Sequence, residues 1–180
     1  MSVRSRFCMA VLIGSSLLPC TSFSSDRGIT PGHTHAVWES ANRALLRLAG
    51  VVHAEDAVVG EMARLRANVF SGKRDEDLES RVIAFHTKLG QLHERLQLKM
   101  DGRNDAASLL EARKPGTQEG VFLVSGHVLD EIVTAYLQKT ADTDPVSDLF
   151  VVQEDQGSSV DGVFGLVDLA HRRLDLLLAR

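Results

Sequence analysis

The sequence DLESRVIAFHTKLGQLHERL, residues 77–96, decides the fold class of this chain. Its apolar residues recur at alternating steps of four and three: Leu78, Val82, Phe85, Leu89, Leu92 and Leu96. Residues three and four apart share one face of an α-helix, so this spacing indicates a single apolar stripe. Three acids, Asp75, Glu76 and Asp77, come first, where the helix dipole favours anions. We predict a long amphipathic helix that begins near residue 76 and buries the stripe.

Similar stripes predict further helices on both sides of this one. We expect helices over residues 34–48, 54–70, 117–137 and 159–179, and shorter ones over 105–113 and 144–153. Glycine or proline follows several of them, as helix ends require. No alternating apolar pattern and no Asn-Gly turn indicates a strand. The sequence therefore predicts an all-α fold. We expect an antiparallel four-helix-type bundle of long amphipathic helices with shorter connecting helices.

The starts of the four long helices, near residues 34, 76, 117 and 159, are evenly spaced. Val37-Trp38, Val121-Phe122 and Val163-Phe164 open three of them, at separations of 84 and 42 residues. Each unit would be one long helix followed by a shorter or less regular segment. Two interpretations stay open at this stage. One is an internal repeat of about 42 residues, and the other is an ordinary bundle whose helices have similar lengths.

Residues 1–24 have the pattern of a secretory signal peptide. Arg4 and Arg6 precede an apolar core over residues 7–19, which is too short for a bilayer span of about 20 residues. We expect cleavage after Ser24, a short disordered linker over 25–33 and a single α-helical domain over 34–180. Residues 17–20 (LLPC) offer an alternative, lipidation at Cys20, although Pro19 stands where a small residue is usual. The protein is expected to be periplasmic or secreted.

Composition excludes several classes of function. The chain has 20 basic and 24 acidic residues, and removal of Arg4 and Arg6 with the leader leaves 18 against 24, a net charge of −6. Such an acidic protein is a poor nucleic-acid binder, because neutralisation of phosphates dominates that affinity. Both cysteines, Cys8 and Cys20, lie in the leader. The exported domain therefore has neither a disulfide nor a thiol nucleophile.

Histidine is the polar residue that stands out, with seven in the chain. Imidazole suits zinc, copper and nickel. His33, His35 and Glu39 form our first candidate for a metal site, since His35 and Glu39 lie one helical turn apart. Two further histidines, His86 and His93, lie two turns apart on one face of the helix near residue 76. None of these spacings matches a His-Glu-x-x-His motif. The competing interpretation is that all of them are solvated or lie at the edge of the core.

Other candidate chemistry is weaker. Trp38, Phe122 and Phe164 would line one end of the bundle as a ligand-binding pocket if the units pack around an axis, or else anchor the core. Ser125 lies in mid-helix and lacks the Gly-x-Ser-x-Gly turn that exposes a nucleophile. Adjacent acids such as Asp130 and Glu131 do not share a helix face, and we expect both at the surface.

These observations favour a non-enzymatic protein of the bacterial cell envelope. We expect it to bind a partner protein of the envelope or a small-molecule ligand, with no cofactor and no nucleic acid. It would meet the membrane only if lipidated at Cys20. The alternative is a histidine-based periplasmic domain that binds or senses a metal, which requires several histidines and a carboxylate to converge.

Overall fold

The computed structural model describes residues 28–53, 57–99, 115–140, 146–150 and 157–179. Every regular element within these ranges is helical: α1 (Pro31–Val52), α2 (Ala57–Arg64), α3 (Asp75–Arg95), α5 (Gln118–Lys139), the 3-10 helix η1 (Ser147–Leu149) and α6 (Val160–Leu178). The predicted all-α fold is confirmed. The export segment, Cys20 and the helix expected over 105–113 lie outside the described residues.

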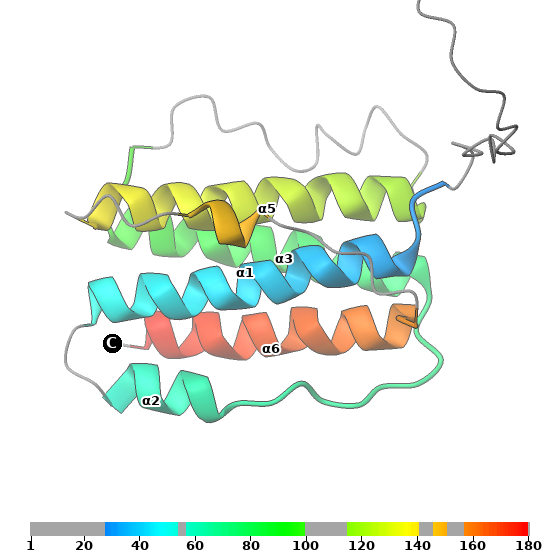
Figure 1. Ribbon diagram of the computed structural model, residues 1–180, viewed down its shortest axis with the longest axis horizontal. Coiled ribbons are helices and arrows are strands. Elements are labelled where there is room, and N and C mark those ends of the chain that lie inside the picture. Colours follow the sequence, from blue (N-terminus) through cyan, green and yellow to red (C-terminus); the bar gives the residue numbers. More distant parts are fainter. Residues whose placement is uncertain (1–27, 54–56, 100–114, 141–145, 151–156, 180) are drawn as a thin grey trace, which may run out of the picture.

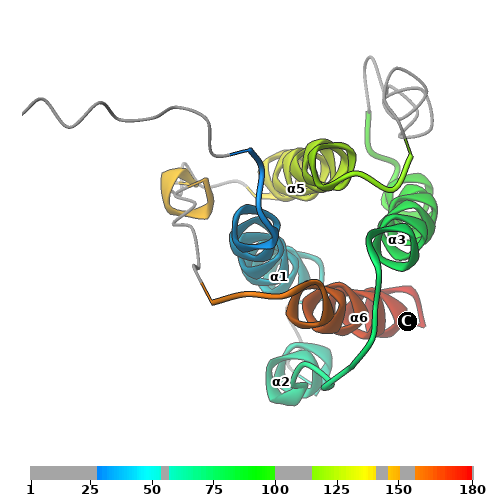
Figure 2. The same ribbon diagram turned by 90° about the vertical axis from the view of Figure 1, so that its right-hand side faces the viewer.

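The long helices α1, α3, α5 and α6 surround one core. Helices α1 and α3 each pack against both α5 and α6, as the end-on view in Figure 2 shows. The apolar stripe of α3 faces inward, with Leu78, Phe85 and Leu89 wholly buried. Trp38, Leu45, Ile132 and Leu174 are buried with them. Helix α2 lies outside this group and contacts α1 and α6.

All four long helices run in the same direction, from right to left in Figure 1. Hydrogen bonds between α3 and α5 show the same shared direction. The Gln118 side chain donates to Asp75 where both helices start, and Lys99 N donates to Gln138 Oε1 across 3.1 Å just beyond the end of α3. The antiparallel arrangement expected from the sequence is therefore wrong.

The length of the connections is what permits the parallel arrangement. Antiparallel neighbours need only short loops, whereas each of the three connections between long helices here has between 20 and 22 residues. A chain of this length can return along a whole helix, which spans about 30 Å for 20 residues. The first connection does so, because Asn68 bonds to Asp168 and Lys73 N bonds to Asp161. It therefore runs opposite to α6.

Helix α2 is shorter than the sequence pattern indicates. We expected a helix over 54–70, but α2 ends at Arg64 and Val69 is 98% exposed. Arginine side chains donate hydrogen bonds to backbone carbonyl groups at this end of α2. Arg173 Nε donates to Met62 O across 3.1 Å, and Arg66 donates to Ala63 O across 2.8 Å. Since these carbonyls gain partners without a further helical turn, the chain can leave the helix and extend along α6.

Two other boundaries differ from expectation. Helix α1 begins at Pro31, within the stretch expected to be a linker, and the helix expected over 144–153 is represented in the described residues by η1 alone. Helix α5 has the length and apolar composition of a membrane span, and 61% of its most apolar window is buried inside the protein. A core helix of a globular domain has the same composition, and burial favours that interpretation for α5.

Candidate metal centre

His86 of α3 and His127 and Glu131 of α5 converge between two neighbouring helices. His127 and Glu131 are four residues apart and therefore share one face of α5. Because α3 and α5 are parallel, residues about 43 apart lie at the same level, as Asp75 and Gln118 do. His86 thus lies at the same height along the helix axes as residue 129, which is between His127 and Glu131. The parallel arrangement of the helices is what assembles the group.

The distances within the group are short. His86 Nε2 lies 3.2 Å from Glu131 Oε2 and 3.3 Å from Oε1. His127 Nε2 lies 3.4 Å from Glu131 Oε1. The two imidazole rings are 5.5 Å apart between centroids and tilted by 44°. One ligand atom from each of the three residues lies within 4.8 Å of the other two.

Glu131 is a carboxylate placed in the interior, with 2% of its surface exposed. Burial raises its pKa, but the hydrogen bond from His86 and the positive charges of His86, His127 and His93 outweigh burial and lower the pKa overall. A buried carboxylate is costly unless a positive group compensates it. This cluster therefore requires positive charge, either as protons on the imidazoles or as a bound cation.

The donor set and spacing fit a transition-metal ion. Zinc is bound by imidazole nitrogen and carboxylate oxygen at about 2.0–2.2 Å, which places the ligand atoms of a tetrahedral site about 3.3–3.5 Å apart. The separations from Glu131 to His86 and His127, 3.3 and 3.4 Å, match that edge length. Two imidazoles and one carboxylate also suit iron, copper and nickel.

The first metal candidate from the sequence is arranged differently. His33 lies at the start of α1, where its Nδ1 accepts a hydrogen bond from Thr30 N across 3.2 Å. His33 thus forms a capping box with Thr30. Glu39 is exposed on α1. Among the described residues, the three metal-ligating side chains whose ligand atoms converge are those of the His86 group, and His33, His35 and Glu39 form no such set.

The sequence indicated only part of the converging group. It singled out His86, together with His93, but not His127, and it placed Glu131 at the surface with Asp130. That expectation is wrong for Glu131, while Asp130 is exposed. Adjacent helical residues are about 100° apart, so one can face outward and the other inward. The signal that could have identified the pair is the four-residue spacing of His127 and Glu131.

The three aromatic residues expected to line a pocket each contact a different ring. Trp38 meets Phe85 edge-on at 5.2 Å between centroids. Phe122 meets His33 at 6.2 Å, and Phe164 meets Phe70 at 4.8 Å. Trp38 is wholly buried, as a core anchor would be.

Ser125 is committed to hydrogen bonds within the core. Its Oγ accepts from Trp38 Nε1 across 2.9 Å and donates to Val121 O across 2.7 Å. It is wholly buried. These contacts give the hydroxyl group a structural role in joining α1 to α5.

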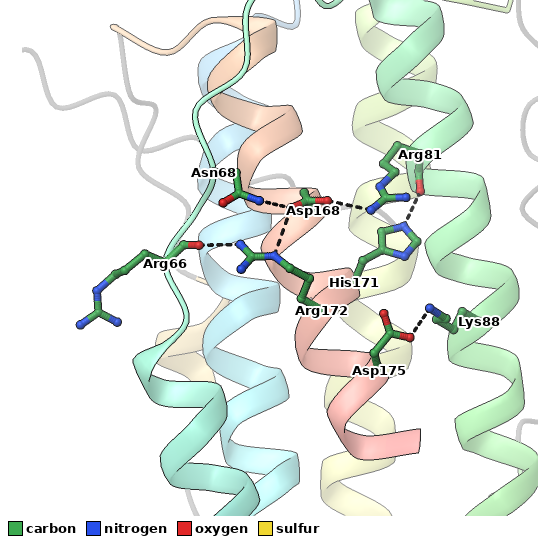
Figure 3. Close-up of polar contacts among 8 residues, drawn as sticks. All are labelled: Arg66, Asn68, Arg81, Lys88, Asp168, His171, Arg172 and Asp175. Atoms are coloured by element: carbon green, nitrogen blue, oxygen red, sulfur yellow. Dashed lines mark hydrogen bonds and ion pairs between the residues drawn. The ribbon is translucent and has the colours of Figure 1, made fainter. Parts of the chain in front are cut away.

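A second concentration of polar residues lies where α3, α6 and the extended stretch after α2 meet (Figure 3). Asp168 accepts hydrogen bonds from Arg81 across 2.8 Å, from Arg172 across 3.1 Å and from Asn68 across 3.0 Å. His171 Nε2 lies 3.0 Å from Arg81 O. Because the carboxylate of Asp168 is already surrounded by cations and an amide, this network ties the three segments together and offers little to a ligand.

The chain matches no protein-family model, and neither the comparison with curated proteins nor that with solved structures found a match.

Proposed function

We propose that the protein binds one divalent transition-metal ion, zinc in the first instance, through His86 Nε2, His127 Nε2 and the carboxylate of Glu131. The observation that carries this proposal is the convergence of two imidazole nitrogens on one buried carboxylate at the separations of a tetrahedral site. The ligands come from two helices, so a bound ion would link α3 to α5.

The charge of the interior supports the same assignment. Glu131 needs a compensating positive charge, and a divalent ion supplies it at neutral pH without protonating the imidazoles. Metal ions bind to neutral imidazole and ionised carboxylate, so a bound ion would replace the imidazole protons as the positive charge beside Glu131.

Metal binding takes precedence here over capture of a partner protein or an organic ligand. The pocket hypothesis depended on Trp38, Phe122 and Phe164, and these three rings each pack against a different neighbour. The metal hypothesis depends on groups that converge. In this proposal the protein is non-enzymatic, is exported by residues 1–24 and works in the bacterial cell envelope, where such ions are accessible.

The proposal extends to the fold, as a four-helix bundle built from a repeated unit of about 42 residues. The order of the contacts supports it. Arg81 bonds to Asp168 and Lys88 to Asp175, and both pairs are 87 residues apart, close to two units. Trp38 and Ser125 are also 87 apart. In a chain of equal units, each a helix plus a returning segment, equivalent positions reach the same level at such multiples.

The test is metal content and affinity in protein purified from the periplasm without a histidine tag. We expect elemental analysis to find about one zinc per chain, and calorimetry on metal-stripped protein to give one site. Glu131→Gln keeps the shape of the side chain and removes the charge, and it should weaken binding about a hundredfold, because a neutral amide oxygen is a much poorer zinc ligand than a carboxylate.

Glu39→Gln is the matched control, because it makes the same change at an exposed carboxylate of α1. It should leave affinity unchanged. Zinc binding that survives Glu131→Gln and fails in Glu39→Gln would move the site to the start of α1. Absence of stoichiometric binding by zinc, copper, nickel and iron would reject the proposal.

A further inference from the structure

We infer that a metal ion held by His86, His127 and Glu131 keeps one coordination position for an exogenous anionic donor, which reaches the ion beside His127. This inference rests on the proposed function and specifies what the metal is there to bind. Three observations carry it: the number of protein donors, the charge they leave on the ion, and the exposure of the three side chains.

The described residues supply three donors to the ion. Within that part of the chain, no fourth histidine, cysteine or carboxylate places a ligand atom within 4.8 Å of all three members of the group. His93 is the nearest candidate by sequence, and its positive charge lowers the pKa of Glu131, yet it is not a member of the converging set. Structural zinc sites are closed by four protein ligands, whereas three protein ligands leave a position for water or another ligand.

The charge of the site selects the class of that ligand. A divalent ion with two neutral imidazoles and one carboxylate retains about one unit of positive charge. An isolated charge in the interior is costly, and a monovalent anionic donor at the fourth position would neutralise it. The site therefore favours a small anion, or the anionic group of a larger molecule, over a neutral donor.

The exposure of the three side chains gives the direction of approach. The side chains of His86 and Glu131 are 5% and 3% exposed, while that of His127 is 22% exposed. The ligand atom His127 Nε2 is itself buried, so a donor would reach the ion past the exposed edge of this ring. At the preceding residue, Gly126, a Cβ would meet nothing within 4 Å, so no packed neighbour covers α5 at that position. Leu123, one turn before His127, is 42% exposed. Asp130 is exposed one turn later, and its negative charge opposes the approach of an anion, so the attraction must come from the ion itself.

Cobalt substitution tests the inference with azide as the probe. Metal-stripped protein is loaded with Co²⁺ and retained metal is measured after ultrafiltration. Its visible absorption spectrum is then recorded during titration with azide. We expect the bands of the cobalt ion to shift in a saturable way and an azide-to-cobalt charge-transfer band to appear, with the cobalt still retained by the protein.

The outcomes separate the two proposals. Cobalt that is retained but whose spectrum does not respond to azide would show a fourth ligand from the protein and overturn the inference, leaving the metal site intact. Failure of the wild type to retain zinc as well as cobalt would overturn the proposed function and the inference with it. Retention in the wild type and loss in Glu131→Gln, together with the azide response, would support both.

Discussion

Arg81 of α3 donates a hydrogen bond to Asp168 of α6 across 2.8 Å, although the two residues are 87 positions apart in the sequence. The same carboxylate accepts from Arg172 and from Asn68 of the returning segment. Asp168 thus holds α3, α6 and the extended stretch after α2 in one place. This single side chain joins three parts of the chain that the sequence alone would not bring together.

Replacing Asp168 should therefore be costly. Asp168→Asn removes the charge that pairs with Arg81 and Arg172 while the side chain is 13% exposed. We expect a loss of about 1–3 kcal/mol in the free energy of unfolding, measured by urea denaturation. Asp175→Asn is the control, since its ion pair with Lys88 joins the same two helices at the surface. That change should cost about 0–1 kcal/mol. Equal effects of the two substitutions would contradict a central role for Asp168.

Two helical glycines should respond to alanine with opposite signs. A Cβ at Gly165 would lie 2.6 Å from Asn68 O, a backbone atom that cannot move without shifting the returning segment. We expect Gly165→Ala to destabilise the protein by about 1–3 kcal/mol. A Cβ at Gly126 meets nothing within 4 Å. Gly126→Ala should stabilise α5 by about 0.5–1 kcal/mol. Thermal melting of the two variants measures the direction of each change in stability. If both substitutions raise the melting temperature, Gly165 does not lie in close contact with the returning segment.

Zinc should stabilise the folded protein through the His86 group. A ligand that binds only the folded state adds about 2.7 kcal/mol at a free concentration 100 times its dissociation constant. We expect zinc to raise the melting temperature of the wild type and to leave His127→Gln and Glu131→Gln nearly unchanged. The exposed-carboxylate variant Glu39→Gln should respond as the wild type does. An equal response in all four proteins would place the metal elsewhere.

The stability of the protein should fall in mild acid partly because of His171. Burial lowers the pKa of this ring below its ordinary value of 6.5, and the nearby cations of Arg81 and Lys88 add to the effect. The hydrogen bond to Arg81 O and the carboxylate of Asp175 act in the opposite direction. The folded protein therefore binds this proton less tightly than the unfolded chain does. Its contribution is constant above about pH 6.5 and decreases as the pH falls from there towards the lower folded pKa.

His171→Gln isolates this contribution. Glutamine can still donate a hydrogen bond to Arg81 O but does not titrate. We expect the difference in unfolding free energy between wild type and variant to shift in favour of the variant as the pH is lowered below 6.5. The measurement is urea denaturation of both proteins across this range in the presence of a chelator. A difference that does not change with pH would show that His171 titrates normally.

Part of the candidate site was accessible from the sequence and part was not. His86 could be singled out because it lies beside a clear apolar stripe. On α5, the four-residue spacing of His127 and Glu131 is also visible in the sequence. The pairing of these two helices depends on their direction. With antiparallel helices, which we expected, the level of His86 relative to His127 and Glu131 would be different. The site could therefore be identified only when the direction of α5 relative to α3 was known.

The sequence by itself determined that this chain is helical and which face of α3 is buried. The stripe from Leu78 to Leu92 specifies its inward face because the helical period is a local property of the backbone. Only the tertiary structure decided that the long helices run in parallel, that α2 ends at Arg64 and that Glu131 lies inside beside His86. The physical reason is that these outcomes depend on contacts between residues 45 to 111 positions apart, such as His86 with Glu131 and Arg173 with Met62. No local pattern of spacing specifies such partners.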